Sequence, residues 1–235
     1  MRFSIEKPFR ALFPEAQIGV VVASSIDNRC NGEDAKEALA AAVAHAATVV
    51  GEDDFASHPA IAPWREAYRR FGVKPSRHRS SIEGLLRSVP AGGPRSINPL
   101  VDLYNAVSLR HLLPCGGEDL DAVQGDVRLT LAAGGESFIP LGSADESPPA
   151  PGEVVYADDA GIICRAWNWR EAERTKLTPE TTRAVLVIEA LPPRTADDLL
   201  AACGDLAESI GHHLGARCRI ALLGGNGVFE TSLDA

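Results

Sequence analysis

Three polar side chains that can bind ligands recur along residues 98–111, namely Asn98, Asp102 and Asn105. At about 100° per residue they fall on one side of a helix. The other side is mostly apolar and consists of Leu100, Leu103, Tyr104, Val107 and His111. This pattern indicates a buried or cleft-lining helix. Its amides and carboxylate either hold a ligand or only bond the backbone of neighbouring loops, and both interpretations are open at this point.

Explicit start and stop signals bound this expected helix. Asn98 can cap it, and Pro99 occupies the first helical position, where its missing N–H has no cost. Pro114 ends it and is followed by Cys115-Gly116-Gly117, which we expect to form a glycine-rich turn. No motif pairs Cys115 with a base, so the sequence gives little reason to assign it the role of a catalytic nucleophile.

A second polar segment contains two tryptophans within three residues. If the segment is extended, Trp167 and Trp169 point to one side, while Asn168 and Arg170 point to the other. Together with Glu171 they would form a pocket wall suited to a flat or aromatic group. The alternative is that both indoles anchor the hydrophobic core.

Positive charge is concentrated in one stretch of an acidic chain. Residues 64–87 contain seven Lys and Arg against two Glu, a net charge of +5, whereas the whole chain carries −9 and the remainder therefore −14. An acidic chain does not adhere nonspecifically to nucleic acid, but a local basic region fits a limited contact with a phosphate-rich partner. We expect Arg77, Arg79 and Arg87 to contact an RNA backbone, the alternative being a solvated helix face.

Cysteine and histidine patterns support neither a metal site nor disulfides. The five cysteines include no CxxC pair, and the six histidines form no HExxH or Cys/His cluster. The N-terminus lacks the apolar region of a signal peptide, and no apolar run of about 18 residues occurs. We therefore expect a cytoplasmic protein with reduced thiols, no metal, no cofactor and no membrane span.

The order of the expected elements predicts an α+β fold rather than a doubly wound sheet, because helices come first and many short strands follow. Expected helices cover residues 34–50, 59–71 and 196–214. Expected strands cover 18–23, 125–132, 137–141, 162–165, 185–189 and 217–223. Residues 80–83 form a capping-box pattern, and 142–152 a surface loop. The glycine turn 224–227 precedes no helix and is a weak phosphate-loop signal.

Several segments, in matching order and spacing, resemble the B3/B4 domain of the phenylalanyl-tRNA synthetase β subunit. They are FGVKPSRHRSSIEGLLRSV, INPLVDLYNAVSL, GGEDLD, GDVRLTLAAGGESF, VVYADDAG and CRAWNWRE. The resemblance covers about residues 59–189 and extends to free-standing bacterial proteins that consist mainly of this domain. It implies one domain over residues 1–235, with mixed and antiparallel sheets in a sandwich-like core flanked by helices. An N-terminal strand and helix and a C-terminal helix and strand would pack on that core.

In that family the domain is an editing site, which hydrolyses the ester between tRNA and a wrongly attached tyrosine. The resemblance places Asn105 at the position of the family's pocket asparagine. Its turn histidine maps to Gly116, so that group is absent here. The acid that selects the tyrosine hydroxyl has no close counterpart, and Glu171 or Glu173 is the nearest acid.

The resemblance therefore implies a free-standing protein that binds the aminoacylated 3′ end of a tRNA and hydrolyses mischarged esters. Asn105, Gly116 and Gly117 would be catalytic, because amide and backbone N–H groups can hold water and stabilise an oxyanion. The substrate-binding residues would be Asp102, Trp167, Asn168, Trp169 and Glu171. Two alternatives remain open, namely a non-catalytic module that binds an amino acid or RNA, and a structural interaction domain.

Overall fold

The structure is a computed structural model that describes residues 1–49, 55–225 and 227–234. It confirms the predicted α+β class, because the sheets are largely antiparallel and because the helices within residues 33–111 follow one another before the strands within residues 115–190. The larger sheet contains, in spatial order, β10 (Glu230–Ser232), β1 (Arg2–Ile5), β4 (Val127–Leu131), β5 (Val154–Ala157), β6 (Ile162–Arg165) and β7 (Arg170–Glu171). Within it β1 and β4 run parallel, and the other neighbours run antiparallel.

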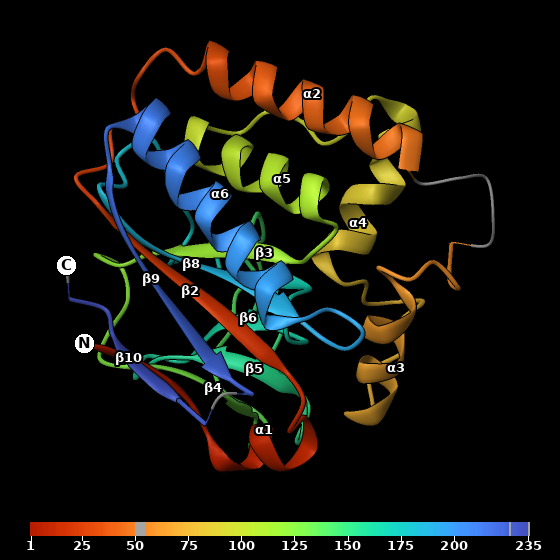
Figure 1. Cartoon of the computed structure of the whole chain (residues 1–235). Helices are drawn as coiled ribbons and strands as arrows, with labels where there is room; N and C mark the ends of the chain where they lie inside the picture. The colour runs from red at the N-terminus through yellow and green to blue at the C-terminus, as the bar shows by residue number, and fades with distance from the viewer. Residues whose placement is uncertain (50–54, 226, 235) are drawn as a thin grey trace.

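The smaller sheet is fully antiparallel and is covered by helices. Its spatial order is β3 (Cys115–Asp119), β8 (Arg183–Ala190), β2 (Gln17–Ser24) and β9 (Arg217–Gly224). Three helices stack above this sheet in Figure 1, namely α2 (Glu33–Val49), α5 (Pro99–His111) and α6 (Ala196–Leu214). The larger sheet lies below it, with α1 (Lys7–Leu12) at the bottom of the view.

A third group of short helices lies along one side of the two sheets, at the right of Figure 1. It comprises α3 (Ala62–Arg70), α4 (Ser81–Ser88) and the 3-10 turn η1 (Val89–Ala91). The Ser80 hydroxyl accepts a hydrogen bond from the N–H of Glu83, which is one half of the expected capping box; the Glu83 carboxylate binds Arg65 and Arg87 instead of the Ser80 N–H. Because α4 directly follows the basic connector 73–79, this cap helps to position the end of the connector that carries Arg77 and Arg79.

The strand β8 shows how one apolar sequence serves both sides of the smaller sheet. Alternate side chains of a strand face opposite sides. Leu186 and Ile188 pack with α6, whereas Val185 belongs to the core between the two sheets. Glu189 is four residues after Val185, so its side chain lies on the same face of the strand. The otherwise apolar run 184–190 therefore places a carboxylate on the inner face of the sheet.

The predicted start of α5 is confirmed. The Asn98 side chain accepts a hydrogen bond of 3.1 Å from the Val101 N–H, and Pro99 occupies the first turn. The helix ends at Leu112, which adopts a left-handed conformation with φ 54°. Nine of its thirteen residues are buried, so α5 is a core helix, as its polar side without lysine or glutamate indicates.

Other expected elements are confirmed with shifted ends. The α6 bounds are those predicted, since Thr195 and Asp198 form a reciprocal capping box. The helix expected over 59–71 is shorter and begins at Ala62. Residue 50, at the end of the helix expected over 34–50, and residue 226, in the expected glycine turn, lie outside the described residues. No helix among the described residues is both long and apolar enough to cross a membrane.

Three expectations about local structure are wrong. Residues 137–141 do not form a strand beside β4, whose antiparallel partner is β5. The Glu146 carboxylate instead accepts hydrogen bonds from the Ser137 hydroxyl and the Phe138 N–H. Pro140 has no backbone N–H and so cannot donate to a neighbouring strand. The expected turn 115–117 is part of β3, because pairing with β8 overrides the turn preference of two glycines.

The tryptophan segment is also not extended. Ala166 and Trp167 have φ of 46° and 63°, so the chain turns sharply there. Only Arg170 and Glu171 form a strand, β7, beside β6. Consequently the two indoles do not share a side, contrary to the expectation. A left-handed turn of two non-glycine residues costs on the order of 1–3 kcal/mol per residue, so packing must hold it in place.

Candidate functional site

A cavity of about 450 Å³ lies between the inner faces of the two sheets and is bounded at the side by α4 and α5. The larger sheet contributes the apolar walls Phe3, Val127 and Ile163. The smaller sheet contributes β3 and the inner face of β8, including Val187. This volume falls in the range of about 300–1,000 Å³ that is usual for small-molecule pockets.

Most of the residues that the sequence singles out line this one cavity. Arg77 and Arg79 come from the basic connector and Asn105 from α5. The remaining predicted residues at the cavity are Gly116, Gly117, Trp167, Asn168, Trp169 and Glu171. Asp102 and Arg87 are not among its lining residues. Four separate segments of the sequence are thus brought together, while the roles predicted for these residues remain predictions.

Asn105 is the amide-bearing residue of α5 that lines the cavity, beside Tyr104. It is partly buried, and among the described residues its amide has no hydrogen-bond partner. The amide therefore has a donor and an acceptor available for a ligand or water. This differs from an asparagine that serves only to bond backbone groups of neighbouring loops.

Asp102, expected to bind substrate, instead supports the segment before the helix. It is only 1% exposed, and its carboxylate accepts hydrogen bonds from the Ile97 N–H at 3.0 Å and from the Ser96 hydroxyl at 2.5 Å. One turn of helix separates it from Asn98, whose side chain is committed to the cap. The interpretation in which the polar stripe bonds neighbouring backbone is thus correct for Asp102.

The two tryptophans have different environments. Trp167 is fully buried, with ring centroids 4.9 Å from Phe9, 4.8 Å from Phe13 and 5.0 Å from Trp64. It is a core anchor that also lines the cavity. Trp169 is partly exposed and meets the His78 ring edge-to-face at 4.2 Å. A single indole, rather than a pair, is therefore available at the surface of the cavity.

Glu171 lines the cavity directly beside the glycines of β3. Among the described residues its carboxylate accepts one hydrogen bond, from the Gly117 N–H to Oε1 at 3.3 Å. Burial raises the pKa of Glu171 from its ordinary value to about 7, although the Gly117 N–H and the Arg170 charge oppose the shift. Near neutral pH this carboxyl group therefore exists in both protonation states.

Glu189 anchors a hydrogen-bonded chain in the depth of the cavity. It is 2% exposed and accepts bonds from the Tyr156 hydroxyl at 2.6 Å and from the Asn168 amide at 2.7 Å. Asn168 in turn accepts from the Tyr68 hydroxyl at 2.9 Å. Burial raises the pKa of Glu189 to about 7, against the opposing effect of its donors Tyr156 and Asn168.

Glu118, on β3, is the third glutamate at the cavity, beside the buried Glu189 and the partly buried Glu171. It is 7% exposed, and its Oε2 atom has no hydrogen-bond partner among the described residues. Burial first, and the Glu171 charge second, raise the pKa of Glu118 well above its ordinary value. Within the described ranges, no three His, Cys, Asp or Glu side chains are arranged to hold a metal ion.

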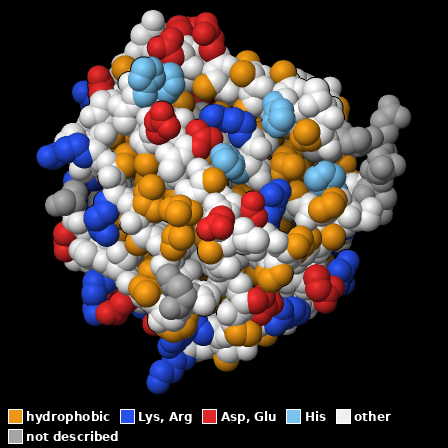
Figure 2. Space-filling view, in the orientation of Figure 1, with side chains coloured by type: hydrophobic (Ala, Val, Ile, Leu, Met, Phe, Trp, Pro, Cys, Tyr) orange, Lys and Arg blue, Asp and Glu red, His pale blue; other side chains and the backbone are white. Residues whose placement is uncertain are grey.

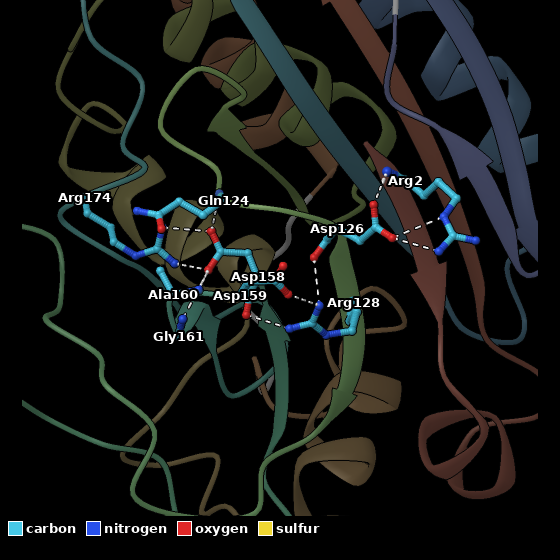
Figure 3. Close-up of polar contacts among 9 residues, drawn as sticks. All are labelled: Arg2, Gln124, Asp126, Arg128, Asp158, Asp159, Ala160, Gly161 and Arg174. Carbon is cyan, nitrogen blue, oxygen red and sulfur yellow. Dashed lines mark hydrogen bonds and ion pairs between the residues drawn. The ribbon is translucent and has the colours of Figure 1, made fainter.

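A buried acid on the outer edge of the molecule shows the opposite behaviour (Figure 3). Asp158 accepts hydrogen bonds from Arg174 and from the N–H groups of Gln124 at 2.8 Å and Ala160 at 2.9 Å. Burial alone would raise the pKa of Asp158, but these donors hold it below its ordinary value. Here the carboxylate stays ionised and joins loops together.

The arginines expected to contact RNA differ in how firmly they are held. Arg77 is exposed and, among the described residues, has no acidic partner. Arg79 is 51% exposed and lies 3.9 Å from Glu83. Arg87 lies 3.0 Å from Glu83 and stacks over Phe55 with its guanidinium 4.8 Å from the ring. Only the first two reach the cavity rim.

The rest of the visible surface gives no sign of a broad basic field. On the face shown in Figure 2, lysine and arginine side chains are scattered among acidic and apolar ones. Together with the net charge of −9, this limits any RNA contact to a local one near the cavity.

Sequence reasoning missed Glu118, Glu189 and Tyr156 as cavity residues. One signal could have found Glu189, since it is the one acid in the otherwise apolar run 184–190, and a buried acid in such a strand needs a reason. Glu118 was hidden in the acidic run that follows the glycines. Tyr156 looks like an ordinary strand residue and gives no signal.

The sequence is similar to that of known proteins. Residues 63–201 match the family model described as the B3/4 domain. Over 107 residues the chain is 34% identical to the phenylalanine–tRNA ligase beta subunit of Cutibacterium acnes, covering 46% of this chain and 12% of that protein. It is 35% identical over 114 residues to the same subunit of Ruegeria pomeroyi, covering 48% and 14%.

The chain thus matches only a small part of those curated relatives. Among solved structures, an N-terminal fragment of the phenylalanyl-tRNA synthetase beta-subunit from Pyrococcus horikoshii superposes with a TM-score of 0.46 at 10% identity. That superposition covers 92% of this chain and 50% of the other.

Proposed function

The chain belongs to the B3/4 domain family, and from this premise we propose that its cavity binds the aminoacylated 3′ end of a tRNA and hydrolyses the ester of a wrongly attached amino acid. The observation that carries the proposal is the meeting, in one cavity, of the unbonded Asn105 amide, the glycine strand β3 and the titratable carboxyl of Glu171. Sequence identity to β subunits of phenylalanine–tRNA ligases supports a substrate of this class.

Hydrolysis of such an ester needs little more than positioning and charge stabilisation. Water attacks the carbonyl carbon, the bond from that carbon to the ribose oxygen breaks, and the water's proton ends on the ribose hydroxyl. An aminoacyl ester is already activated, so a site that holds water near the carbonyl and stabilises the developing oxyanion can accelerate it. The absence of a Ser–His or Cys–His pair from the sequence is compatible with this mechanism.

Asn105 is the donor we assign to the oxyanion or to the attacking water. Its amide has no competing partner among the described residues, whereas the Gly117 N–H already donates to Glu171. Gly116 on β3 lets the Glu171 carboxylate approach the strand backbone closely, because a Cβ at this position would lie 3.0 Å from Glu171 Oε1. Glycine at this place keeps the strand backbone within reach of a substrate.

The cavity walls and rim fit the two ends of an aminoacylated nucleotide. Phe3, Val127 and Ile163 offer an apolar surface for an aromatic or aliphatic amino-acid side chain. Arg77 and Arg79 lie on the rim and are exposed, as expected for groups that contact phosphates of the 3′ end. Glu171 would bind the amino-acid part.

The proposal is tested by deacylation of a panel of charged tRNAs, including tyrosyl- and phenylalanyl-tRNA(Phe). We expect turnover of at least one mischarged species, and Asn105→Ala should slow it about 10²–10³-fold with little change in KM, since the amide acts chiefly in the transition state. Asn31→Ala is the matched control, because Asn31 is exposed and remote from the cavity. It should retain the wild-type rate.

Two results would contradict the proposal. One is the absence of turnover with every charged tRNA. The other is turnover that Asn105→Ala leaves unchanged. Binding of amino acids without any hydrolysis would instead favour a non-catalytic binding module.

A further inference from the structure

We infer that the carboxylates of Glu118 and Glu171 together bind a primary ammonium group, the free α-amino group of the aminoacyl ester, so that the cavity accepts aminoacyl esters and excludes N-acylated ones. The inference rests on the proposed function for the identity of the ligand. The site itself is formed by side chains of β3 and β7.

The two carboxylates project toward the same place. Gly116 and Glu118 are two residues apart on β3, so their side-chain directions lie on one face of the strand. A Cβ on Gly116 would lie 3.0 Å from Glu171 Oε1, and the Gly117 N–H donates to that oxygen at 3.3 Å. Glu171 therefore covers the face of β3 from which Glu118 projects, and both line the cavity.

This pair lacks the counterion that buried acids have elsewhere in the molecule. Glu118 is 7% exposed, and no described residue reaches its Oε2 with a hydrogen bond. By contrast, Glu153 is bonded at 2.8 Å by Arg165, and Glu83 at 2.9 Å by Arg65. A buried carboxylate without a partner is costly, so a cation that enters the cavity gains both carboxylates as acceptors.

The charged and titratable groups around the pair do not satisfy it. Arg174 is committed to Asp158, and Arg170 is exposed and bonded to the Leu141 carbonyl. The other groups that interact with the pair are neutral or acidic, namely the Thr175 hydroxyl, Tyr104 on α5, Cys115 on β3, Cys164 on β6 and Asp158 after β5. Burial, together with the mutual repulsion of the two acids, raises the pKa of Glu118, and an ammonium group would reverse that effect.

A primary ammonium group matches the site better than other cations do. It has three N–H donors on one small centre, so it can bond both carboxylates while its substituent extends into the apolar cavity. Acylation of the nitrogen removes the charge and two donors and adds bulk where the two acids meet. The predicted substrates are therefore esters of free amino acids, as opposed to peptidyl or formylated esters.

The first experiment needs no variant. Binding of tyrosinamide and N-acetyltyrosinamide is compared by titration calorimetry, with leucinamide and its N-acetyl form as a second pair so that the side chain does not decide the result. Hydrolysis of tyrosyl- and N-acetyltyrosyl-tRNA(Phe) is measured in parallel. We expect at least tenfold tighter binding of the free amides and at least tenfold faster hydrolysis of the free ester.

Matched variants then locate the effect. Glu118→Gln and Glu171→Gln should each weaken binding of the free amides at least tenfold while leaving the N-acetyl forms unaffected. Glu173→Gln is the control, because Glu173 lies two residues from Glu171 but binds Lys176 and the Gly142 N–H outside the cavity. It should bind the amides as the wild type does.

The outcomes separate this inference from the proposed function. Equal binding and equal hydrolysis of free and N-acetyl forms would overturn the inference while the hydrolase proposal stands. Selective binding of the free amides without hydrolysis of any ester would support the ammonium site and overturn the proposed function. Failure of all four amides to bind, together with no hydrolysis, would overturn both.

Discussion

Two regions of this molecule bury carboxylates, and they handle the charge in opposite ways. At the outer loops, Asp158 is surrounded by Arg174 and backbone donors, which hold its pKa below the ordinary value (Figure 3). In the cavity, Glu171 and Glu189 meet hydroxyl, amide and N–H donors but no bonded arginine, and burial raises the pKa of each to about 7.

The difference separates acids that hold the fold together from acids that are left for a ligand. A carboxylate paired with arginine is ionised whenever the protein is folded, and it gains nothing from a new partner. An unpaired buried acid lowers stability at neutral pH, so its retention points to a use in binding or catalysis. Isosteric amide substitutions should therefore have opposite effects in the two regions.

The largest effect is expected from Asp158→Asn. The amide keeps the shape of the side chain but cannot accept from Arg174 and from the backbone donors at both oxygens. We expect the free energy of unfolding to fall by about 3 kcal/mol, since Arg174 loses its partner. Urea unfolding followed by tryptophan fluorescence at pH 7 measures this.

The neighbouring acid supplies the control for that prediction. Asp159 is 63% exposed and pairs with Arg128 at 2.7 Å on the surface. Asp159→Asn should change the free energy of unfolding by less than about 1 kcal/mol. Equal losses in the two variants would show that the buried carboxylate of Asp158 contributes no more to stability than the exposed carboxylate of Asp159.

Glu189→Gln should have the opposite sign. The pKa of Glu189 is about 7 in the folded protein, above the ordinary value of 4.5, so the folded state binds more protons between these values and wild-type stability falls as pH rises through this window. The amide cannot ionise. Relative to the wild type, the variant should therefore gain about 2 kcal/mol of unfolding free energy between pH 5 and pH 8.

Unfolding curves of both proteins at the two pH values check this, with Glu180→Gln, at an exposed glutamate, as the control. A difference between Glu189→Gln and the wild type that does not change with pH would mean that Glu189 is ionised throughout and belongs with Asp158.

The sequence predicts the scaffold of the site better than its chemistry. Local signals suffice for α5 and α6, whose caps at Asn98 and Thr195 are readable from residue type and spacing. They fail where long-range pairing decides, as at β3, whose glycines suggest a turn, and at Trp167, whose left-handed turn is held by the aromatic core. Residue type alone indicates neither outcome.

The same limit explains which site residues could be found. Asn105 and Glu171 stand out because they break an apolar or aromatic pattern and because the family resemblance points to their segments. The unpaired state of Glu118 depends on Arg174 being held by Asp158, a contact made across distant loops. No local pattern encodes which arginine a given acid will receive.

A smaller effect concerns the pH dependence of ligand binding. Because the pKa of Glu171 is about 7, its ionised fraction rises about fivefold between pH 6 and pH 7, a range in which an α-amino group remains a cation. The affinity for tyrosinamide should rise by about the same factor. Calorimetry at both pH values measures it, and Glu171→Gln should reduce the dependence to the part that Glu118 contributes, since burial also raises the pKa of Glu118. A wild-type affinity that is independent of pH would place Glu171 among the permanently ionised acids.

The smallest predicted effect extends the comparison of paired and unpaired charges to the arginines. Arg77 is exposed at the cavity rim, with no acidic partner among the described residues, whereas Arg87 is bonded to Glu83 and stacked on Phe55. Arg77→Ala should weaken tRNA binding a few-fold and reduce the slope of log affinity against log salt by about 1, as expected for one lost phosphate contact. Arg87→Ala should leave that slope unchanged and lower only the free energy of unfolding, by less than about 1 kcal/mol. Filter binding of charged tRNA over a series of salt concentrations distinguishes the two variants.

The contradicting outcome is a salt slope that Arg87→Ala reduces as much as Arg77→Ala does. An arginine bonded within the protein would then contact RNA as readily as an unpaired one. The difference between paired and unpaired carboxylates would in that case not extend to the basic side chains.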